Sequence, residues 1–405
     1  MKILQLCNKP PYPPVDGGTL AMNSITQGLL DAGHDVKVLS VCSDKHPVRE
    51  QQMPESYREQ TRFEAVYVDL GVKAIDAGVA LLCGDSYHVK RFESKAFEQK
   101  LNQVLKEETF DVIHIESIFL ASYVELIRKR TQAPIILRAH NVEHQIWQRI
   151  AQQTPSFFRR WYIKHLALSL RAYEVEMAPQ FDGIACITAQ DADFFRTLCR
   201  RPIIDLPFGL VTNELDESVD VEPYSLFHIG SMDWLPNEES IRWFLKNVWP
   251  KLHQEVPQAR LYLAGRKMPS DLMSAQIDGV KMVGEVDDSI RFMASKQINI
   301  VPLLSGSGIR VKIIEAMSIG KTVVSTTVGA QGIKCKDGEH ILIADTPDDF
   351  VRQVKRCVED QEFCSQVGKN AFDLIANEYD NRILTEQLLS FYQRLVRKKQ
   401  PQDDE

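Results

Sequence analysis

The residues whose types and spacing are best suited to chemistry lie in one glycine-rich stretch, residues 303–332. The stretch reads LLSGSGIRVKIIEAMSIGKTVVSTTVGAQG, so an apolar strand breaks into glycines and a short helical run follows. Glycines in such a turn let backbone N–H groups approach an anion, and Arg310 and Lys312 add full positive charge beside them. The pattern indicates a phosphate-binding site, although an ordinary turn between a strand and a helix explains the glycines equally well.

Glu315 adds a group suited to a different part of a ligand. It follows Lys312 by three residues, so both side chains can share one face of a helix. A carboxylate beside a phosphate site is placed to accept hydrogen bonds from the two hydroxyl groups of a ribose. The alternative is a solvated Lys/Glu pair on a helix surface, which requires no ligand.

Polar residues also follow expected strands in the first half of the chain. His140 comes three residues after a strand at 134–137 and is the best acid–base or hydrogen-bonding candidate in this half. Gly17 and Gly18 end a proline-rich loop and can bring backbone N–H groups against a ligand. A histidine satisfied within a loop network, and a plain turn before a helix, are the alternative interpretations.

The elements that must position these residues alternate between strands and helices, which is typical of an α/β fold with parallel sheets. The G-x-G-x-x-G fingerprint of dinucleotide-binding folds is absent, because the first loop is too long and too rich in proline. Strands in both halves end in glycine or polar residues, at the edge where α/β folds bind ligands. The expected strands span 2–7, 35–41, 65–70, 111–115, 134–137, 183–188 and 203–206 in the first half and 225–229, 260–264, 280–283, 298–303 and 322–326 in the second.

This order of elements predicts two Rossmann-like domains. A chain of 405 residues is long enough for two or three domains, each with a core of its own. We expect an N-terminal domain at 1–210, an acidic linker at 211–224 and a C-terminal domain at 225–379. A last helix at 380–397 precedes a polar tail at 398–405.

The composition is typical of a soluble globular protein, with 44% hydrophobic and 25% charged residues. The formal charge of −7 argues against nucleic acid as a partner, because binding a phosphate backbone requires a basic surface. The eight cysteines show neither a CxxC pair nor a Cys/His metal spacing, so we expect a reducing compartment and no metal site. The first strand is too short for a signal peptide, and no apolar run is long enough to span a membrane. These features predict a cytoplasmic protein.

Basic and aromatic residues alternate in the segment 157–164, which reads FFRRWYIK. One interpretation is a helix that lies on the inner face of a membrane as a peripheral contact. The other is a core helix with a rim of Arg and Lys side chains. We prefer the core helix, because apolar residues continue through Leu170.

Four motifs in order resemble the GT-B glycosyltransferases of family four, the glycosyl transferases group one. They are the Pro-rich loop with Gly17-Gly18, AHNVEHQIW, GSMDWLPN and GIRVKIIEAMSIGKTVVST. The resemblance extends through nearly the whole chain. It implies two Rossmann-like domains that face a cleft, with the last helix returning to the first domain. It also implies a retaining transferase, such as a hexosyltransferase, that needs neither a metal nor a cofactor.

The same resemblance implies the substrates and their places. The C-terminal domain is expected to bind a nucleotide-sugar donor, and the N-terminal domain a glycan or lipid-linked acceptor of cell-envelope polysaccharide synthesis. His140 corresponds to a histidine that contacts the transferred sugar. Glu315 corresponds to the second Glu of an E-x7-E motif, which binds the ribose. The implied donor-binding positions are Gly17, Gly18, Gly230, Ser231, Gly284, Val286, Ser307, Gly308 and Glu315.

The chain departs from the family pattern at two places. Ser307 stands where the first Glu of E-x7-E is expected, and GSMDWLPN replaces a loop that ordinarily carries an Arg and a Lys on the diphosphate. Arg310 and Lys312 are the replacements we expect for that clamp, which makes them catalytic candidates together with His140. The departures indicate a variant branch of the family.

Two further functions fit a GT-B scaffold. An epimerase that acts on a nucleotide-sugar without an acceptor would need additional acid–base groups, and only His140 and Glu116 are well placed for that role. A non-catalytic protein that binds a nucleotide-sugar is suggested by Ser307 and the missing Arg/Lys pair. We therefore expect a glycosyltransferase and keep both alternatives for the experiment to decide.

Overall fold

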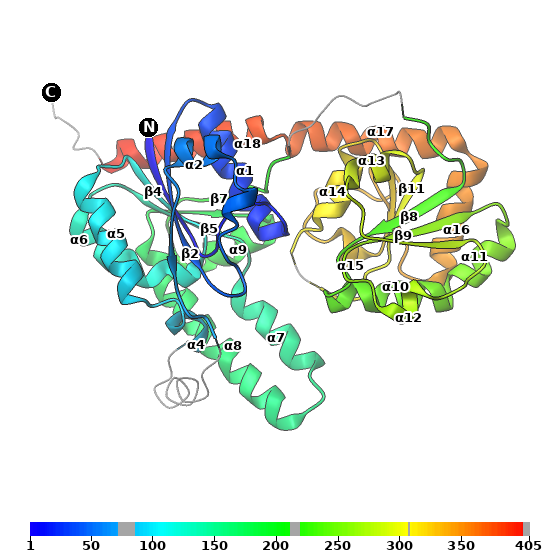
Figure 1. The fold of residues 1–405 in the computed structure, drawn as a ribbon, viewed down its shortest axis with the longest axis horizontal. Helices are drawn as coiled ribbons and strands as arrows, with labels where there is room; N and C mark the ends of the chain where they lie inside the picture. Colours follow the sequence, from blue (N-terminus) through cyan, green and yellow to red (C-terminus); the bar gives the residue numbers. More distant parts are fainter. Residues whose placement is uncertain (72–85, 211–218, 307, 400–405) are drawn as a thin grey trace. The chain divides into compact units, whose positions relative to one another are not determined.

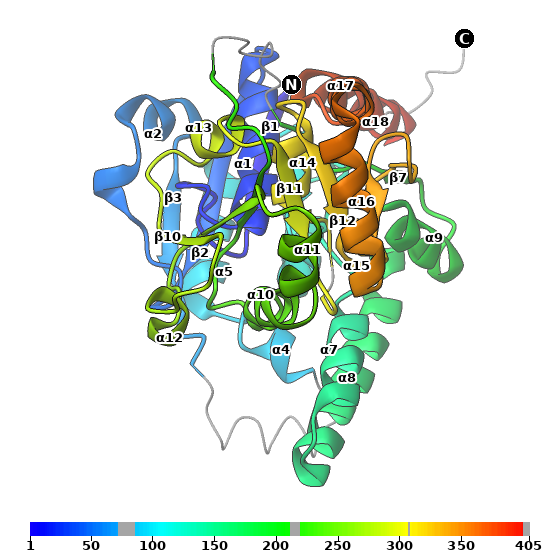
Figure 2. The same cartoon turned by 90° about the vertical axis from the view of Figure 1, so that its right-hand side faces the viewer.

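The computed structural model describes residues 1–71, 86–210, 219–306 and 308–399. These residues form two compact units, each with its own parallel sheet (Figures 1 and 2). Unit 1 comprises Met1–Gly209 and Asn381–Glu405, and unit 2 comprises Leu210–Asp380. The predicted α/β class is confirmed. Residues 211–218 of the expected linker and 400–405 of the expected tail lie outside the described residues.

Unit 1 is built on a seven-stranded parallel sheet in the order β3-β2-β1-β4-β5-β6-β7. Most of its strands are continuous buried runs, as expected when helices cover both faces of a sheet. The strand order reverses at β1, so ligands of such folds bind outside the carboxyl ends of β1 and β4. The strands are β1 (Lys2–Cys7), β2 (Asp35–Cys42), β3 (Glu64–Tyr67), β4 (Val112–Ile115), β5 (Ile135–Ala139), β6 (Gly183–Cys186) and β7 (Ile203–Asp205).

Helices cover both faces of this sheet. The described α-helices of unit 1 are α1 (Gly17–Asp31), α2 (Glu55–Thr61), α4 (Tyr87–Lys90), α5 (Lys95–Glu107), α6 (Val124–Arg130), α7 (Glu143–Gln153), α8 (Phe157–Met177), α9 (Ala189–Leu198) and α18 (Asn381–Lys399). Short 3-10 helices are η1 (Glu50–Gln52), η2 (Ile118–Tyr123) and η3 (Ala178–Gln180). Helices α7 and α8 form a hairpin that projects from the rest of unit 1 in both ribbon views (Figures 1 and 2).

The C-terminal helix α18 is part of the unit 1 core. Its buried side chains pack with those of α1, β1 and β2 on one face of the sheet. Two glycines allow this close approach: a Cβ atom on Gly28 would lie 2.0 Å from Thr385 Oγ1, and one on Gly183 would lie 2.6 Å from Phe391 Cζ. The side chain of Asn381 also donates to the Ser24 carbonyl oxygen at 2.9 Å.

Unit 2 repeats the design with six parallel strands in the order β10-β9-β8-β11-β12-β13. Its reversal lies at β8, between β9 and β11. The strands are β8 (Ser225–Ile229), β9 (Arg260–Ala264), β10 (Val280–Gly284), β11 (Ile298–Val301), β12 (Thr322–Ser325) and β13 (Leu342–Ile343). The α-helices are α10 (Leu235–Asn247), α11 (Trp249–Glu255), α12 (Ser270–Met273), α13 (Ser289–Ala294), α14 (Val311–Met317), α15 (Thr327–Ala330), α16 (Pro347–Glu359) and α17 (Gln361–Glu378).

The structure adds two elements and corrects one expectation. Helix α7 and the two-residue strand β13 were not predicted. The core position preferred for residues 157–164 is wrong, because 69% of Phe157, 81% of Phe158 and 57% of Trp161 are exposed. Burial along α8 begins only at Leu166, since the first turns of this helix extend beyond the sheet.

Candidate functional site

Three glycines hold the ends of β8, β9 and β10 close together at the carboxyl edge of the unit 2 sheet. The amide of Gly265 donates to the Gly284 carbonyl at 2.7 Å, and that of Gly230 donates to the Ala264 carbonyl at 3.1 Å. Gly265 has a φ of +147°, and a Cβ atom on it would lie 1.7 Å from the Gly230 carbonyl oxygen. Only glycine fits this position, so the loops at this edge pack backbone against backbone.

Arg310 and Trp234 connect the loops that follow β8 and β11, two neighbouring strands of the sheet. The guanidinium carbon of Arg310 lies 5.3 Å from the centroid of the Trp234 ring. Its Nη1 donates to the Gly308 carbonyl at 2.8 Å, and the residue is buried. A Cβ atom on Gly306 would lie 2.6 Å from Arg310 Nη2 and 3.0 Å from Trp234 Cη2, so this glycine makes room for the stack. Arg310 is therefore a pre-oriented cation at the edge where ligands bind.

Lys312 and Glu315 lie on one face of α14, as their spacing predicted. Lys312 Nζ and Glu315 Oε2 are 2.5 Å apart, and the Lys312 side chain is the more exposed of the two. The ammonium group of Lys312 and the carboxylate of Glu315 follow Arg310 by two and five positions in the chain. Ser307, which was predicted to bind the donor, lies outside the described residues.

The other predicted residues of unit 2 also lie at this edge of the sheet. Ser231 Oγ donates to Asp233 Oδ1 at 2.5 Å, and its carbonyl accepts from Asn237 Nδ2 at 2.9 Å. Gly308 has a φ of +76°, and Gly284, with a φ of +75°, ends β10 immediately before the turn that contains Val286. Unit 2 thus gathers at one edge Gly230, Ser231, Gly284, Val286, Gly308, Arg310, Lys312 and Glu315.

In unit 1, the buried carboxylate of Glu116 organises a polar network at the end of β4. Gln5 Nε2 donates to Glu116 Oε1 at 2.6 Å, and His114 Nε2 lies 3.1 Å from the same oxygen. His114 Nδ1 in turn is 2.5 Å from the hydroxyl of Tyr392 on α18. Burial favours the protonated form of Glu116, but His114 and His140 outweigh this effect and hold the pKa of its carboxyl well below the usual value.

His140 is held by the same carboxylate. Its Nε2 lies 2.9 Å from Glu116 Oε2, and 14% of its side chain is exposed. Burial lowers the pKa of His140, although the Glu116 carboxylate acts in the opposite direction. Because an ionised carboxylate can only accept hydrogen bonds, Nε2 of the neutral ring carries the proton and Nδ1 is an acceptor. His140 is therefore fixed in one tautomer that can accept a hydrogen bond from a hydroxyl group.

Gly17 and Gly18 form the first turn of α1. Asp16 caps this helix: its carboxylate accepts from the Thr19 amide at 2.9 Å and pairs with Lys9 Nζ at 2.7 Å. A Cβ atom on Gly18 would lie 3.0 Å from Lys9 Nζ, so the glycine leaves room for this ammonium group. Burial is the main cause that lowers the pKa of His140, and the positive charge of Lys9 acts in the same direction.

Sequence reasoning missed several residues that support the predicted ones. Trp234 was noticed only as part of a loop, and nothing in the sequence pairs it with Arg310, 76 positions later. Lys9 had a weak signal, since it lies two residues after the end of the first strand. Tyr392 had none, because it lies 278 residues from its partner His114.

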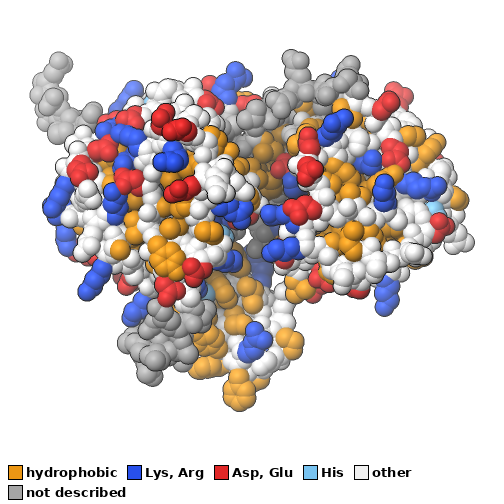
Figure 3. All heavy atoms as spheres, in the orientation of Figure 1, with side chains coloured by type: hydrophobic (Ala, Val, Ile, Leu, Met, Phe, Trp, Pro, Cys, Tyr) orange, Lys and Arg blue, Asp and Glu red, His pale blue; other side chains and the backbone are white. Residues whose placement is uncertain are grey.

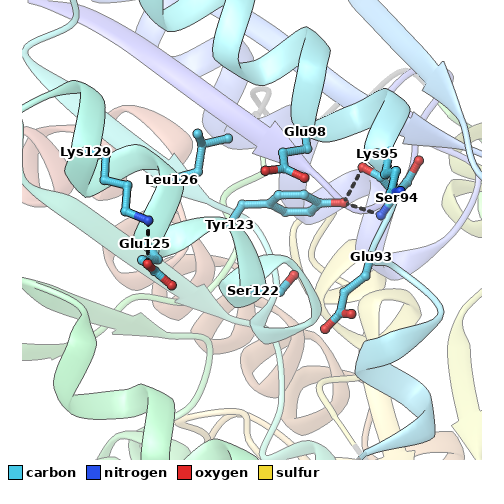
Figure 4. Close-up of a pocket in the computed structure, with 9 residues that line it drawn as sticks. All are labelled: Glu93, Ser94, Lys95, Glu98, Ser122, Tyr123, Glu125, Leu126 and Lys129. Atoms are coloured by element: carbon cyan, nitrogen blue, oxygen red, sulfur yellow. Dashed lines mark hydrogen bonds and ion pairs between the residues drawn. The ribbon is translucent and has the colours of Figure 1, made fainter.

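A pocket of about 450 Å³ lies in unit 1 beside the start of α5 and the η2–α6 segment (Figure 4). Its lining includes none of the predicted site residues. Tyr123 donates from its hydroxyl to the Phe92 carbonyl at 2.6 Å, and Lys129 pairs with Glu125 at 2.6 Å. These groups are engaged with neighbouring protein atoms, and we assign the pocket no part in the chemistry.

Within the ranges that the structure describes, no group of three or more His, Cys, Asp or Glu residues is arranged to hold a metal ion. In the same part of the chain, no helix has both the length and the apolar character needed to cross a bilayer.

Two family models match the chain, one in each unit. The model described as "Glycosyl transferases group 1" matches residues 223–360, and the model described as "Glycosyl transferase 4-like domain" matches residues 16–203. The chain is a group 1 glycosyltransferase. The resemblance inferred from the four sequence motifs is thereby confirmed, and the assignment to a variant branch stays a prediction.

Relatives of this glycosyltransferase match it over almost its whole length. A phosphatidyl-myo-inositol mannosyltransferase from Mycolicibacterium smegmatis is 23% identical, over 97% of this chain and 94% of its own. An uncharacterized protein in the cps region of Klebsiella pneumoniae is 22% identical, over 94% of this chain and 97% of its own. The crystal structure of Anabaena HepE in complex with UDP superposes with a TM-score of 0.66 at 15% identity, over 97% of this chain and 100% of that one. The glycosyltransferase therefore has the GT-B fold.

Proposed function

We propose that this glycosyltransferase moves a sugar from a nucleoside diphosphate donor to a glycan or lipid-linked saccharide. The observation that carries the proposal is the Arg310–Trp234 stack beside the Lys312–Glu315 pair, at the carboxyl edge of the unit 2 sheet. Anabaena HepE, which has the same fold, has been solved with UDP and with UDP-glucose. A nucleotide-sugar is accordingly the ligand class that suits this edge.

Different residues of unit 2 bind different parts of the donor. Glu315 accepts hydrogen bonds from the ribose hydroxyls, and the backbone around Gly284 and Val286 faces the base. The glycine turns after β8 and β11 bring N–H groups to the diphosphate, with Gly308 in one of them. A ribose hydroxyl that binds Glu315 competes with the ammonium group of Lys312 for the Glu315 carboxylate. Donor binding therefore also frees Lys312 to turn toward the diphosphate.

Arg310 and Lys312 act on the leaving group. Negative charge builds on the diphosphate as the bond to the sugar breaks, and cations that are already in position stabilise that charge without reorganising. The stack on Trp234 holds the guanidinium of Arg310 in one orientation. These two residues take over the role of the absent Arg/Lys clamp, and no metal ion is needed for the step.

Unit 1 contributes His140 to the transferred sugar. Its Nδ1 accepts a hydrogen bond from a sugar hydroxyl, and Glu116 keeps the ring in the required tautomer. Gly17 and Gly18 present the first turn of α1 to the donor, beside the charge of Lys9. We propose that the anomeric configuration is retained, as the family resemblance implies.

The names of two relatives support the proposed acceptor class. One relative is named for transfer of mannose to a phosphatidyl-myo-inositol, and another is named for the cps region. We propose a saccharide acceptor, free or lipid-linked, in the synthesis of a cell-envelope polysaccharide.

The test is a panel of UDP-, GDP- and ADP-sugars with candidate acceptors, followed by product analysis. We expect one donor class to release nucleotide only when an acceptor is present, with the same rate in EDTA and with the donor's anomeric configuration in the product. Conversion of the donor without an acceptor would instead support an epimerase. Binding without transfer to any acceptor would support a non-catalytic protein, and no binding even at millimolar nucleotide would overturn the proposal.

The roles of Arg310 and Lys312 make a sharper prediction. We expect Arg310→Ala and Lys312→Ala each to lower kcat by about 10²–10³, because each removes a donor aimed at developing charge. The matched control is Lys336→Ala, since Lys336 is an exposed lysine of the same unit that pairs with Glu339. Steady-state kinetics with saturating donor separate a loss in kcat from a loss in binding. A Lys312→Ala variant with full activity would remove this residue from the clamp.

A further inference from the structure

The helical hairpin of α7 and α8 exposes its most apolar residues at its far end. The two helices pack along their length and are joined by residues 154–156. At this end the side chains of Phe157, Phe158 and Trp161 are mostly exposed, whereas large aromatic residues are ordinarily buried. Figure 3 shows hydrophobic side chains gathered over the hairpin down to its tip. The tip is defined here as residues 157–164.

The exposed apolar residues continue along one face of α8. Leu168 and Val175 are also exposed, and they follow Trp161 at intervals of seven residues. A spacing of seven is two helical turns, so the three side chains form one stripe. Helix α8 therefore has an apolar stripe on its solvent-exposed face.

Away from its base, where Glu143, Glu174 and Glu176 lie, the hairpin carries charge of one sign only. Residues 144–173 contain no Asp or Glu, although the chain as a whole has a net charge of −7. The same 30 residues contain five Arg or Lys residues, namely Arg149, Arg159, Arg160, Lys164 and Arg171. Arg159, Arg160 and Lys164 are exposed and lie among the aromatic residues of the tip.

The hairpin is anchored at its base, so its tip is held in a defined direction within unit 1. The buried carboxylate of Glu174 on α8 accepts from the Glu143 amide of α7 at 2.8 Å and lies 2.5 Å from His144 Nδ1. The rings of His88 and Trp147 stack with centroids 4.1 Å apart, which ties α7 to α4.

We propose that the tip of the α7–α8 hairpin binds the surface of an anionic lipid bilayer. Aromatic side chains that enter the interface beside cations that meet lipid phosphates are the two contributions that such binding requires. A protein partner would need a complementary acidic surface with an apolar centre, whereas a bilayer offers both features over any area. This inference goes beyond the proposed transferase activity, because binding to lipid can be measured without donor or acceptor.

The experiment is flotation of the full chain with vesicles. The vesicles are phosphatidylcholine alone and phosphatidylcholine mixed with phosphatidylglycerol, at low and at high salt. We expect binding to the mixed vesicles at low salt, weaker binding at high salt because salt screens the cations, and little binding to phosphatidylcholine alone. Absence of binding to the mixed vesicles at low salt would overturn the proposal.

Two triple variants separate the apolar and the charged contributions. We expect Phe157→Ser/Phe158→Ser/Trp161→Ser and Arg159→Gln/Arg160→Gln/Lys164→Gln each to weaken binding by roughly 100-fold. The controls remove exposed residues of the same kinds elsewhere: Tyr67→Ser/Val221→Ser for the apolar set and Lys129→Gln/Arg200→Gln/Lys246→Gln for the charged set. Controls that lose binding as strongly as the tip variants would contradict a specific docking surface.

Two further measurements keep the outcome clear. Lipids with brominated chains should quench part of the tryptophan fluorescence of the wild type, and Trp161→Phe should remove that part while binding persists. Sedimentation velocity tests the competing occupant, a second copy of this chain. A wild-type dimer that the apolar variant converts to a monomer, with no quenching by brominated lipid, would assign the tip to self-association and overturn the proposal.

Discussion

The buried carboxylate of Glu116 controls what His140 can do. Gln5, His114 and His140 all place ring or amide nitrogen atoms against it, from two strands and a loop. The carboxylate is ionised because the pKa of Glu116 is held low, so it directs the Nε2 proton of His140 inward. Glu116 is a positioning residue, and His140 presents the atom that meets a ligand.

Replacing Glu116 should therefore change the pH dependence of transfer as well as its rate. We expect Glu116→Gln to lower kcat roughly 10- to 100-fold, as losses of orienting partners commonly do. In the wild type, activity falls when acid protonates His140 and removes its acceptor. Since Glu116 raises the pKa of His140 against the effect of burial, the variant should lose activity at a lower pH than the wild type. The measurement is kcat/KM against pH.

The control for this change is Glu125→Gln, which removes a carboxylate that is exposed on the same unit. It should leave both the rate and the acid limb unchanged. An equal loss of rate for Glu116→Gln at every pH, with no shift of the acid limb, would mean that Glu116 only maintains the local structure.

At the scale of elements, most strands were predictable, whereas the exposure of the first turns of α8 was not. The runs at 2–7, 225–229 and 260–264 coincide with β1, β8 and β9, because a strand covered on both faces is mostly apolar. The strand expected at 65–70 ends at Tyr67 as β3, whose residues are only partly buried. Periodicity identified α8 as a helix but not which of its apolar residues lie beyond the core.

The candidate site was also predictable only in part. Loops at the ends of strands could be recognised from glycines and charges, so His140, Arg310 and Glu315 were found as candidates. Lys312, the partner of Glu315, was predicted from its spacing. Trp234, which contacts Arg310, and Tyr392, which contacts His114, come from elements distant in sequence. Packing brings such residues together, and a single sequence contains no periodicity that indicates it.

The α7–α8 hairpin depends on one carboxylate at its base. We expect Glu174→Ala to destabilise the hairpin by roughly 3 kcal/mol, because it removes a charged acceptor from two donors at once. Hydrogen exchange should become faster in α7 than in the sheet. The control is Glu176→Ala on the same helix, where the residue is exposed and a change within about 0.5 kcal/mol is expected. Unchanged exchange in α7 would show that other contacts hold the hairpin.

At the scale of the whole molecule, the two units differ in how the chain builds them. Unit 2 is one continuous segment, Leu210–Asp380, with its own apolar core. Unit 1 is interrupted, because α18 returns after unit 2 to complete its core. The order of synthesis therefore leaves unit 1 incomplete until the last helix has been made.

The contribution of α18 predicts how the two units behave when they are separated. The helix buries Leu384, Leu388, Phe391, Tyr392 and Leu395 in the unit 1 core. At about 1.5–3 kcal/mol for each such side chain, its removal costs roughly 10 kcal/mol, comparable with the whole stability of a domain. We expect a fragment of residues 210–380 to unfold cooperatively and a fragment of residues 1–209 to lack a cooperative transition by calorimetry. Joining residues 381–399 to the fragment of residues 1–209 through a flexible linker should restore its cooperative transition. The same extension with Phe391→Asp should not restore it. Cooperative unfolding of residues 1–209 alone would show that the sheet and its other helices are sufficient, and that α18 only covers a completed core.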